Sequence, residues 1–267
     1  MTQVNIIGAG RVGQAFLKVL GSKVRDVASA RYASAAMAVE QAGQGRATVV
    51  ADMRAAEVWL LTVPDTQIRS VSSDLARAGH PPAIALHCSG FHTADVMAPL
   101  RDAGWQLASA HPNLSFADPV VAAASFPGTP CGIEGDAAAV EAIENLLIEV
   151  GARPFRIASD RKALYHAAAV FSNNFATVLQ AIAREAWNDA GVPDDLAEDI
   201  NASLLRATCE NTILHGPRDA LTGPAARGDT DVVASQGEYV AQWNAPAGEL
   251  YRVLSAMAAR LKADGSL

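Results

Sequence analysis

One segment of the chain, KALYHAAAVFSNN from Lys162 to Asn174, combines proton-exchanging side chains with the alanines and aromatics of a packed helix. At about 100° per residue, one arc of about 60° holds its polar members. These members are Lys162, His166, Asn173 and Thr177. The opposite side of the helix is apolar and can dock on a core, while Tyr165 and small residues flank the polar stripe. We therefore expect the stripe to line a cleft.

The chemistry that such a stripe offers is proton transfer and the stabilisation of a negatively charged oxygen, which the reduction of a carbonyl group would use. A ketone needs a hydride and a group that stabilises and protonates its oxygen. The ammonium of Lys162 could do both, and the imidazole of His166 could relay or replace the proton. Asn173 would orient the substrate. The alternatives are a lysine that extends to solvent and a hydrogen-bonded structural histidine.

The start of the chain predicts a dinucleotide site. The apolar run VNII leads directly into GAGRVG and an amphipathic segment, which indicates a strand, a turn and a helix. Gly8 permits the tight turn, Gly10 leaves room for a pyrophosphate, and Gly13 lets the helix pack closely. The helix N-terminus adds N–H donors and a favourable dipole. A tight turn without an anion is the alternative. The predicted cofactor residues here are Gly8, Gly10, Arg11, Val12 and Gly13.

The end of the second expected strand, near DVASARYAS, favours NADP over NAD. An NAD site usually places an acid there, whereas a guanidinium accommodates the 2′-phosphate of NADP. Arg31 stands at this point with Ser34 nearby, and no Asp or Glu does. Arg31 could otherwise be a solvated surface residue.

Three further strand candidates, EVWLLTVPD, AIALHCSG and WQLASAHPNLSF, each end in a polar loop. The carboxyl ends of parallel strands share one edge, so these loops should line one crevice with the cofactor. Asp65 could instead cap a helix, and Ser89 with Gly90 could merely make a turn. We assign Thr62, Val63, Pro64, Asp65, His87 and Ser89 to the cofactor, and Ser89 and His111 to the substrate, with Gly90 and Asn113 beside them.

The order of elements predicts two domains of an α/β fold. CGIEGD, a helix and ARPFRI complete a last βαβ unit, and from Asp160 onward the pattern is helical. One helix should run from Ser159 or Asp160 to about Asn188, and another from Asp194 or Asp195 to about His215. We predict a doubly wound, parallel Rossmann domain at 1–158 and an all-helical substrate or dimerisation domain at 159–267.

Composition excludes several classes of partner. The net charge of -7 and the lack of any Lys/Arg run argue against nucleic acid and anionic membranes. No metal-ligand spacing appears, so no metal is expected. The odd number of cysteines, 3, favours a reducing cytosol. With neither a leader pattern nor a long apolar run, a soluble, cytoplasmic protein is expected.

The motifs IIGAGRVG, TVPD, LHCSG, HPNLSF, KALYHAAAVFSNN and LTGPAARGD resemble those of a superfamily of NADP-dependent reductases. It includes ketopantoate reductase, β-hydroxyacid dehydrogenases and pyrroline-5-carboxylate reductase. More closely, they resemble a branch that joins a Rossmann-like domain to a C-terminal domain of unknown function, some members of which serve as ketopantoate reductases. The resemblance implies a helical domain like that of 6-phosphogluconate dehydrogenase, NADP(H), a ketopantoate-like 2-keto acid as the favoured substrate, and a homodimer formed through the helical domain.

The resemblance also assigns residues. β-Hydroxyacid dehydrogenases and ketopantoate reductases carry a catalytic lysine that Lys162 matches, with an asparagine one turn later, where this chain has His166 instead. The loop LTGPAARGD resembles in placement a substrate loop of pyrroline-5-carboxylate reductases. It makes Thr222, Arg227 and Asp229 candidates for substrate binding, with Arg227 as a clamp for a carboxylate.

Three other readings of the same residues stay open. A reductase of cyclic imines, of the pyrroline-5-carboxylate type, would depend on Thr222 more than on Lys162. Chemistry like that of prephenate dehydrogenase is suggested by His111 and Pro112 after a strand, although it would run in the oxidative direction. A non-catalytic NADP-binding sensor or scaffold would bind the cofactor without turnover.

Overall fold

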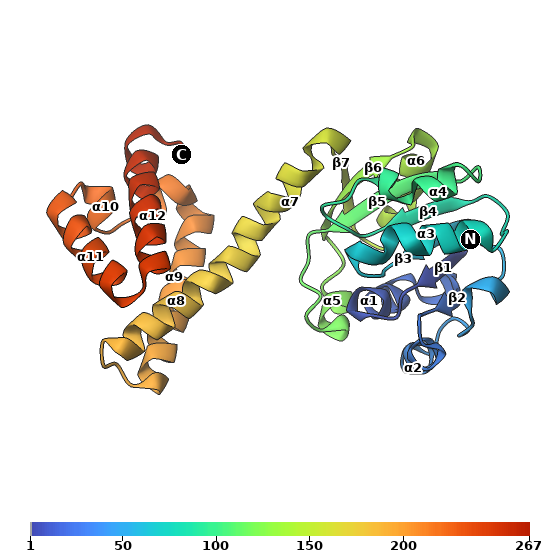
Figure 1. Cartoon of the computed structure of the whole chain (residues 1–267), viewed down its shortest axis with the longest axis horizontal. Coiled ribbons are helices and arrows are strands. Elements are labelled where there is room, and N and C mark those ends of the chain that lie inside the picture. Colours follow the sequence, from blue (N-terminus) through green and yellow to red (C-terminus); the bar gives the residue numbers. More distant parts are fainter. Residues whose placement is uncertain (1) are drawn as a thin grey trace. The chain divides into compact units, whose positions relative to one another are not determined.

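The computed structural model describes residues 2–267 and divides between Val170 and Phe171 into two compact units. The first unit contains a sheet of seven strands in the order β2-β1-β3-β4-β5-β6-β7, and Figure 1 shows helices around it. The strands are β1 (Val4–Ile7), β2 (Val24–Ala28), β3 (Val58–Leu61), β4 (Ile84–His87), β5 (Gln106–Pro112), β6 (Pro130–Gly135) and β7 (Arg153–Arg156). The α/β Rossmann fold that the sequence predicts is confirmed.

The sheet departs from the prediction in one pair of strands. All neighbours run parallel except β5 and β6, which pair antiparallel with Ala110 opposite Ile133. The predicted doubly wound parallel sheet is thus parallel in every pair of described strands except this one. The loop and the short helix between β5 and β6 reverse the chain, so that β6 and β7 form their own parallel βαβ unit around α6 (Ala137–Glu149).

The two faces of the sheet bury separate apolar clusters. Val4 and Ile6 of β1 pack in one cluster and Ile7 in the other, as the alternation of side chains along a strand requires. The first cluster includes residues of α1 (Arg11–Leu20), α2 (Tyr32–Ala42) and α6. The second includes residues of α3 (Ile68–Arg77) and α4 (Ala98–Arg101). Because both faces are covered, the strands read as continuous apolar runs.

The order of the strands places a crevice at β1 and β3. From β1 the chain moves outward to β2, then returns to place β3 on the other side of β1. Such a reversal opens a crevice at the carboxyl ends of the two central strands. The glycine turn after β1 therefore lies where the fold binds ligands.

The remaining elements are helical, as predicted. They are α5 (Pro119–Ala124), α7 (Lys162–Val170), α8 (Ala176–Asp189), α9 (Asp194–Ala220), α10 (Pro224–Arg227), α11 (Thr230–Trp243) and α12 (Ala245–Asp264). A π-helical turn, Phe171–Phe175, joins α7 to α8. The helix predicted to end near His215 does break at Gly216, whose φ is 76°.

The change from strands to helices falls where the sequence predicts it, but the compact units divide later. The last strand ends at Arg156, close to the predicted boundary at residue 158. The first unit nevertheless extends to Val170. The reason is that α7 packs on the sheet through Lys162 and Tyr165.

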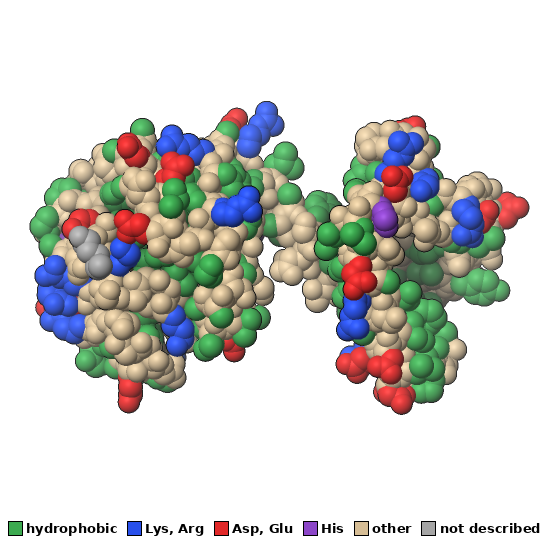
Figure 2. Space-filling view, turned by 180° about the vertical axis from the view of Figure 1, so that it is seen from behind, with side chains coloured by type: hydrophobic (Ala, Val, Ile, Leu, Met, Phe, Trp, Pro, Cys, Tyr) green, Lys and Arg blue, Asp and Glu red, His purple; other side chains and the backbone are tan. Residues whose placement is uncertain are grey.

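The helical unit buries almost nothing of its own. Among residues 171–267, the structure buries only Ala197, Ala247 and Gly248. Large apolar side chains are exposed instead, among them Ile213 at 83% and Leu214 at 74%. Figure 2 shows hydrophobic side chains over the surface of this unit. In the described part of the chain, no helix has both the length and the apolar character that a membrane span requires.

Candidate active site

The glycine turn after β1 is built so that two of its residues cannot carry a side chain. Gly8 has a φ of 118°, and a Cβ there would lie 2.7 Å from the backbone of Thr62. A Cβ on Gly13 would lie 2.0 Å from the carbonyl oxygen of Gly8. The hydroxyl of Thr62 donates to that same oxygen at 2.8 Å. The turn and the end of β3 therefore hold each other in place.

Gly10 differs from its neighbours because the space beside it is open. A Cβ on Gly10 would meet nothing within 4 Å, and Gly10 stands immediately before α1 with no side-chain cap. The first turn of α1 has no acidic residue. Its N–H groups and dipole therefore face a space that a phosphate can fill, and the residues present fit a nucleotide. Arg11 is exposed and Val12 is half-buried at this helix start.

Arg31 lies just after β2 and directly precedes α2, with its side chain exposed. The amide of Ser34 donates to the carbonyl oxygen of Arg31 at 3.0 Å, which shapes the first turn of α2. A free guanidinium at the carboxyl end of β2 is what a 2′-phosphate would require. Tyr32, which the sequence analysis did not single out, is also exposed there, at 57%.

The loops after β3 and β4 are joined by a hydrogen bond between two predicted residues. The hydroxyl of Ser89 donates to Oδ2 of Asp65 at 2.7 Å and accepts from the amides of Phe91 and His92. Ser89 thus also makes the turn that was considered as its alternative role. Asp65 does not cap α3, because the residue at the N-cap position is Gln67. The carboxylate of Asp65 accepts the hydrogen bond from Ser89 instead. Val63 is half-buried and Pro64 is exposed on the same loop.

His87 is buried behind the turn after β4, and its predicted contact with a cofactor stays a prediction. It is fully buried, its Nδ1 accepts from the amide of Ser89 at 3.1 Å, and its Nε2 lies 3.1 Å from the carbonyl oxygen of Thr93. The turn after β4 therefore uses both ring nitrogens. Burial, with a smaller contribution from the charge of Lys162, lowers the pKa of His87 to about 3.

This buried histidine predicts a loss of stability in acid. Its folded-state pKa of about 3 lies below the ordinary value of 6.5, so between these values the unfolded chain binds more protons. We expect the free energy of unfolding to fall by up to roughly 1.4 kcal/mol per pH unit as the pH drops through this window. Urea unfolding at several pH values measures the slope. His87→Asn should make it shallower, and an unchanged slope would contradict the assignment.

Lys162 is buried and paired, which the sequence did not reveal. Its Nζ donates to Oε1 of Glu134 at 3.0 Å and to the hydroxyl of Ser109, and its side chain is 1% exposed. Burial lowers the pKa of Lys162, although the charge of Glu134 opposes this. The ammonium therefore does not face a cleft in this structure, which favours a positioning role over proton donation.

Glu134 is the centre of this cluster and was missed by the sequence analysis. Its Oε1 also accepts from the amide of Ala94, and its Oε2 accepts from the hydroxyl of Ser159. The cluster thus ties β5, β6 and the loop after β4 to the start of α7. The one signal in the sequence was a glutamate inside the apolar strand CGIEGD, where an acid needs a buried partner.

Two predicted histidines converge on Gly90, at the carboxyl end of β4. A Cβ on Gly90 would lie 2.3 Å from Nδ1 of His166 and 2.9 Å from Nε2 of His111. The two rings stand nearly perpendicular with centroids 5.4 Å apart. Among the described residues, Nδ1 of His166 is buried and has no hydrogen-bond partner. Such an atom needs an explanation, and a ligand that binds there would provide one.

Tyr165 and Asn113 hold the other side of His111. The hydroxyl of Tyr165 lies 3.1 Å from Nδ1 of His111 and accepts from Nδ2 of Asn113 at 2.6 Å. A Cβ on Gly132 would lie 2.7 Å from this hydroxyl, so the glycine admits it. Burial, followed by the charges of His166 and Lys162, lowers the pKa of His111 to about 4. Tyr165 precedes His166 in KALYH, which is the only hint that the sequence offers.

The remaining predicted residues lie in the second unit. Asn173 is exposed within the π-helical turn, and Thr222 is exposed before α10. Nη2 of Arg227 forms an ion pair with Oδ2 of Asp229 at 2.8 Å. The guanidinium of Arg227 is therefore already paired with a carboxylate of its own loop.

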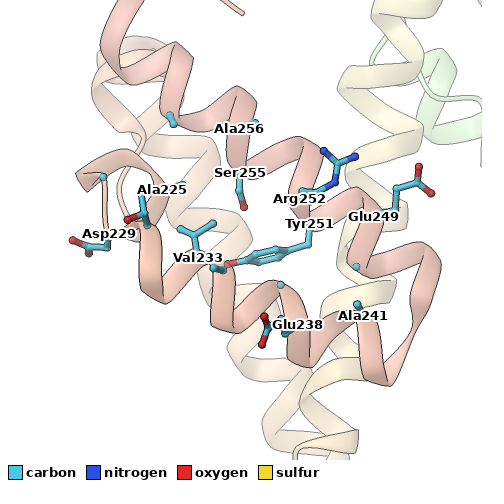
Figure 3. A pocket seen from close by; sticks show the side chains of 16 residues that line it. Ala225, Asp229, Val233, Glu238, Ala241, Glu249, Tyr251, Arg252, Ser255 and Ala256 are labelled. Carbon is cyan, nitrogen blue, oxygen red and sulfur yellow. The ribbon is translucent and has the colours of Figure 1, made fainter.

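A groove of about 840 Å³ lies among α10, α11 and α12 (Figure 3). Of the three residues predicted from LTGPAARGD, Asp229 lines it and Thr222 and Arg227 do not. Most of its other lining residues are small, and Tyr251 donates from its hydroxyl to Gln236 at 2.7 Å. The groove is lined by residues of the second unit.

Comparisons with known proteins agree with this architecture. Residues 1–112 match the model of a Rossmann-like domain, and residues 129–258 match the model of a domain of unknown function, DUF2520. The chain therefore carries the two domains that the sequence motifs indicate. No curated protein matches the sequence.

Solved structures with the same fold span the whole chain. A protein from Thermotoga maritima is 24% identical, with a TM-score of 0.79 over 98% of this chain and 99% of its own. A proposed NADP oxidoreductase from Bacteroides fragilis is 21% identical, with a TM-score of 0.76 over 97% and 98%. A pyrroline-5-carboxylate reductase from Coxiella burnetii is 13% identical, with a TM-score of 0.64 over 100% and 99%. At these identities the likeness concerns the fold.

Proposed function

We propose that the protein is an oxidoreductase that uses NADPH to reduce a small carbonyl compound, with a ketopantoate-like 2-keto acid as the favoured substrate. The observation that carries this proposal is the convergence of Nε2 of His111 and Nδ1 of His166 at Gly90. Gly90 follows Ser89, which is bonded to Asp65 after β3, and Thr62 at the end of β3 is bonded to the glycine turn. The histidine pair is therefore continuous with the nucleotide crevice.

The chain offers a complete set of groups for the nucleotide. The N–H groups at the start of α1 would hold the pyrophosphate in the space beside Gly10, and Arg31 would hold a 2′-phosphate. When bound, the dihydronicotinamide supplies the hydride. Chains of related fold described as an NADP oxidoreductase and a pyrroline-5-carboxylate reductase support a cofactor of this class.

The histidine pair provides what the oxygen of a ketone requires. As the new C–H bond forms, the electron pair of the C=O π bond moves onto the oxygen. His111 donates a hydrogen bond to that oxygen, and His166 in its protonated form transfers a proton to it, which leaves an alcohol and a neutral imidazole. Lys162 does not enter this step. It fixes the start of α7 and with it the position of His166.

Removal of the guanidinium after β2 tests the preference for NADP. Arg31→Ala is expected to raise the Kd of NADPH by about ten- to hundredfold, because a charge-assisted hydrogen bond to phosphate is lost. The Kd of NADH should not change. Calorimetric titration measures both values, and Arg153→Ala, another exposed arginine, serves as the control. If Arg31→Ala raised the Kd of NADPH and of NADH by the same factor, Arg31 would not recognise the 2′-phosphate.

The substrate class is tested by NADPH consumption with 2-ketopantoate and, separately, with pyrroline-5-carboxylate. Turnover of the keto acid supports the proposal. Turnover of the imine alone would move the assignment to a cyclic imine reductase, the activity named for the structure from Coxiella burnetii. NADPH binding without turnover of either compound would contradict the proposal and favour a sensor or scaffold.

We also propose that two copies of the chain pair through their helical units. A unit with almost no buried apolar side chain is not stable alone, and a second copy would cover its exposed surface. The groove shown in Figure 3, in which alanine and glycine make up half of the lining residues, can accept a helix of the second copy.

We expect the wild-type protein to sediment as a dimer. The double variant Ile213→Asp and Leu214→Asp should shift it toward monomer or aggregate, because two charges would enter an apolar contact. Met37→Asp places one such charge on an exposed apolar residue of the first unit and should leave the dimer intact. Analytical ultracentrifugation measures the mass, and a monomeric wild-type protein would contradict the proposal.

A further inference from the structure

A chain of hydrogen bonds links His111 to Tyr165, Asn113 and the backbone of Pro130. The contact with Pro130 determines which group donates in each of these bonds. Nδ2 of Asn113 lies 3.2 Å from the carbonyl oxygen of Pro130 and 2.6 Å from the hydroxyl of Tyr165. A backbone carbonyl can only accept, so the atom facing it must be the amide nitrogen and not the amide oxygen. Asn113 therefore donates to Pro130 and to Tyr165.

The proton of the Tyr165 hydroxyl must then point elsewhere. This hydroxyl has one proton to donate, and it already accepts from Asn113. Two acceptors are within reach, Nδ1 of His111 at 3.1 Å and the carbonyl oxygen of His111 at 3.4 Å. The shorter contact is to the ring nitrogen. An Nδ1 that accepts from Tyr165 carries no proton of its own.

We infer that Tyr165 and Asn113 fix His111 in the neutral tautomer that carries its proton on Nε2. Because Nε2 lies beside the position that a Cβ of Gly90 would take, the ring presents a hydrogen-bond donor there, next to the unpartnered Nδ1 of His166. The lowered pKa of His111 agrees with a neutral ring at physiological pH. Tyr165 and Asn113 are thus positioning residues.

This arrangement deepens the proposed function, and the use of the donor by a substrate rests on that function. A neutral imidazole can polarise a carbonyl oxygen by donating a hydrogen bond without giving up its proton. His111 and His166 would then differ in role: His111 polarises the oxygen and His166 protonates it.

The tautomer is measured by long-range ¹H–¹⁵N NMR of the full-length protein with labelled histidine. The chain has 6 histidines, and His111→Gln identifies the signals of His111 by their loss. The wild-type protein should show His111 with a protonated Nε2 and an unprotonated Nδ1. Tyr165→Phe should give a mixture of tautomers, because the donor to Nδ1 is gone.

A second variant reverses the chain of hydrogen bonds. Asn113→Asp replaces the donor with an acceptor, so Tyr165 should donate to the new carboxylate and accept from Nδ1 of His111. We expect the proton of His111 to move to Nδ1. Tyr251→Phe removes another tyrosine that is bonded to an amide side chain, Gln236, and should change nothing.

Two results would overturn the inference: a wild-type His111 protonated on Nδ1, or an Asn113→Asp variant with the wild-type pattern. The NMR measurement needs no substrate, so its failure is distinct from a failure of the proposed function. A correct tautomer in a protein that reduces no carbonyl compound would contradict the proposed function and support the inference.

Discussion

Replacement of His166 by glutamine is expected to lower kcat for 2-ketopantoate by about 10²- to 10⁴-fold, which is the usual contribution of a general acid. Nδ1 of His166 is buried, has no hydrogen-bond partner among the described residues and lies against Gly90, next to Nε2 of His111. The amide side chain introduced by His166→Gln would keep part of the volume of the ring but could not give up a proton. Steady-state kinetics with NADPH measure kcat and KM.

The size of this effect must be separated from damage to the fold. The Kd of NADPH for His166→Gln should match that of the wild-type protein, because His166 is not among the groups expected to hold the nucleotide. His215→Gln, at the kink of α9, provides a control for the loss of an imidazole elsewhere. If His166→Gln kept its kcat while Lys162→Met lost it with NADPH binding intact, the acid would be Lys162.

The second large effect concerns stability. Glu134→Ala is expected to lower the free energy of unfolding by about 3–5 kcal/mol, because it leaves the charge of Lys162 buried without its partner. The substitution also removes the acceptor for the amide of Ala94 and the hydroxyl of Ser159. Trp59 and Trp105 are buried in the same unit, so their fluorescence follows its unfolding in urea.

Two controls define the origin of this loss. Glu149→Ala removes an exposed partner of Lys23 and should have a much smaller effect, since surface ion pairs contribute little. The double variant Glu134→Leu and Lys162→Met replaces the pair with apolar groups and should recover much of the stability. A Glu134→Ala protein as stable as Glu149→Ala would mean that the pair does not support the fold.

The sequence predicted the frame of the site well. The runs VNII, EVWLLTVPD and AIALHCSG did become β1, β3 and β4. The reason is that a strand buried on both faces must be apolar throughout, and such an apolar run can be recognised in the sequence without knowledge of its partners. The roles of Gly8 and Gly13 could also be predicted from the sequence, because neither position has space for a side chain.

The partners of single polar residues could not be predicted in this way. Lys162 meets Glu134 because β6 pairs antiparallel with β5. No motif in the sequence of either strand predicts this pairing. A helical wheel shows which residues share a face but not what the face meets. His87 was assigned to the cofactor for its place at the end of a strand, yet the turn that follows uses both of its ring nitrogens.

The helix itself departs from the geometry on which the polar stripe was based. The wheel assumed about 100° per residue from Lys162 to Thr177. The π-helical turn at Phe171–Phe175 has more residues per turn than an α-helix, so the assumed angle per residue does not hold through it. π-Turns are rare and have no strong signal in a single sequence.

The central claim, that this protein transfers a hydride to a carbonyl carbon, is tested most directly by following the hydride itself. The purified protein is incubated with NADPH deuterated at the transferable position and with 2-ketopantoate, and the product is analysed by NMR. We predict one deuterium on the newly formed carbinol carbon. NADPH that binds but leaves its deuterium on the cofactor, with the keto acid unchanged, would contradict the claim.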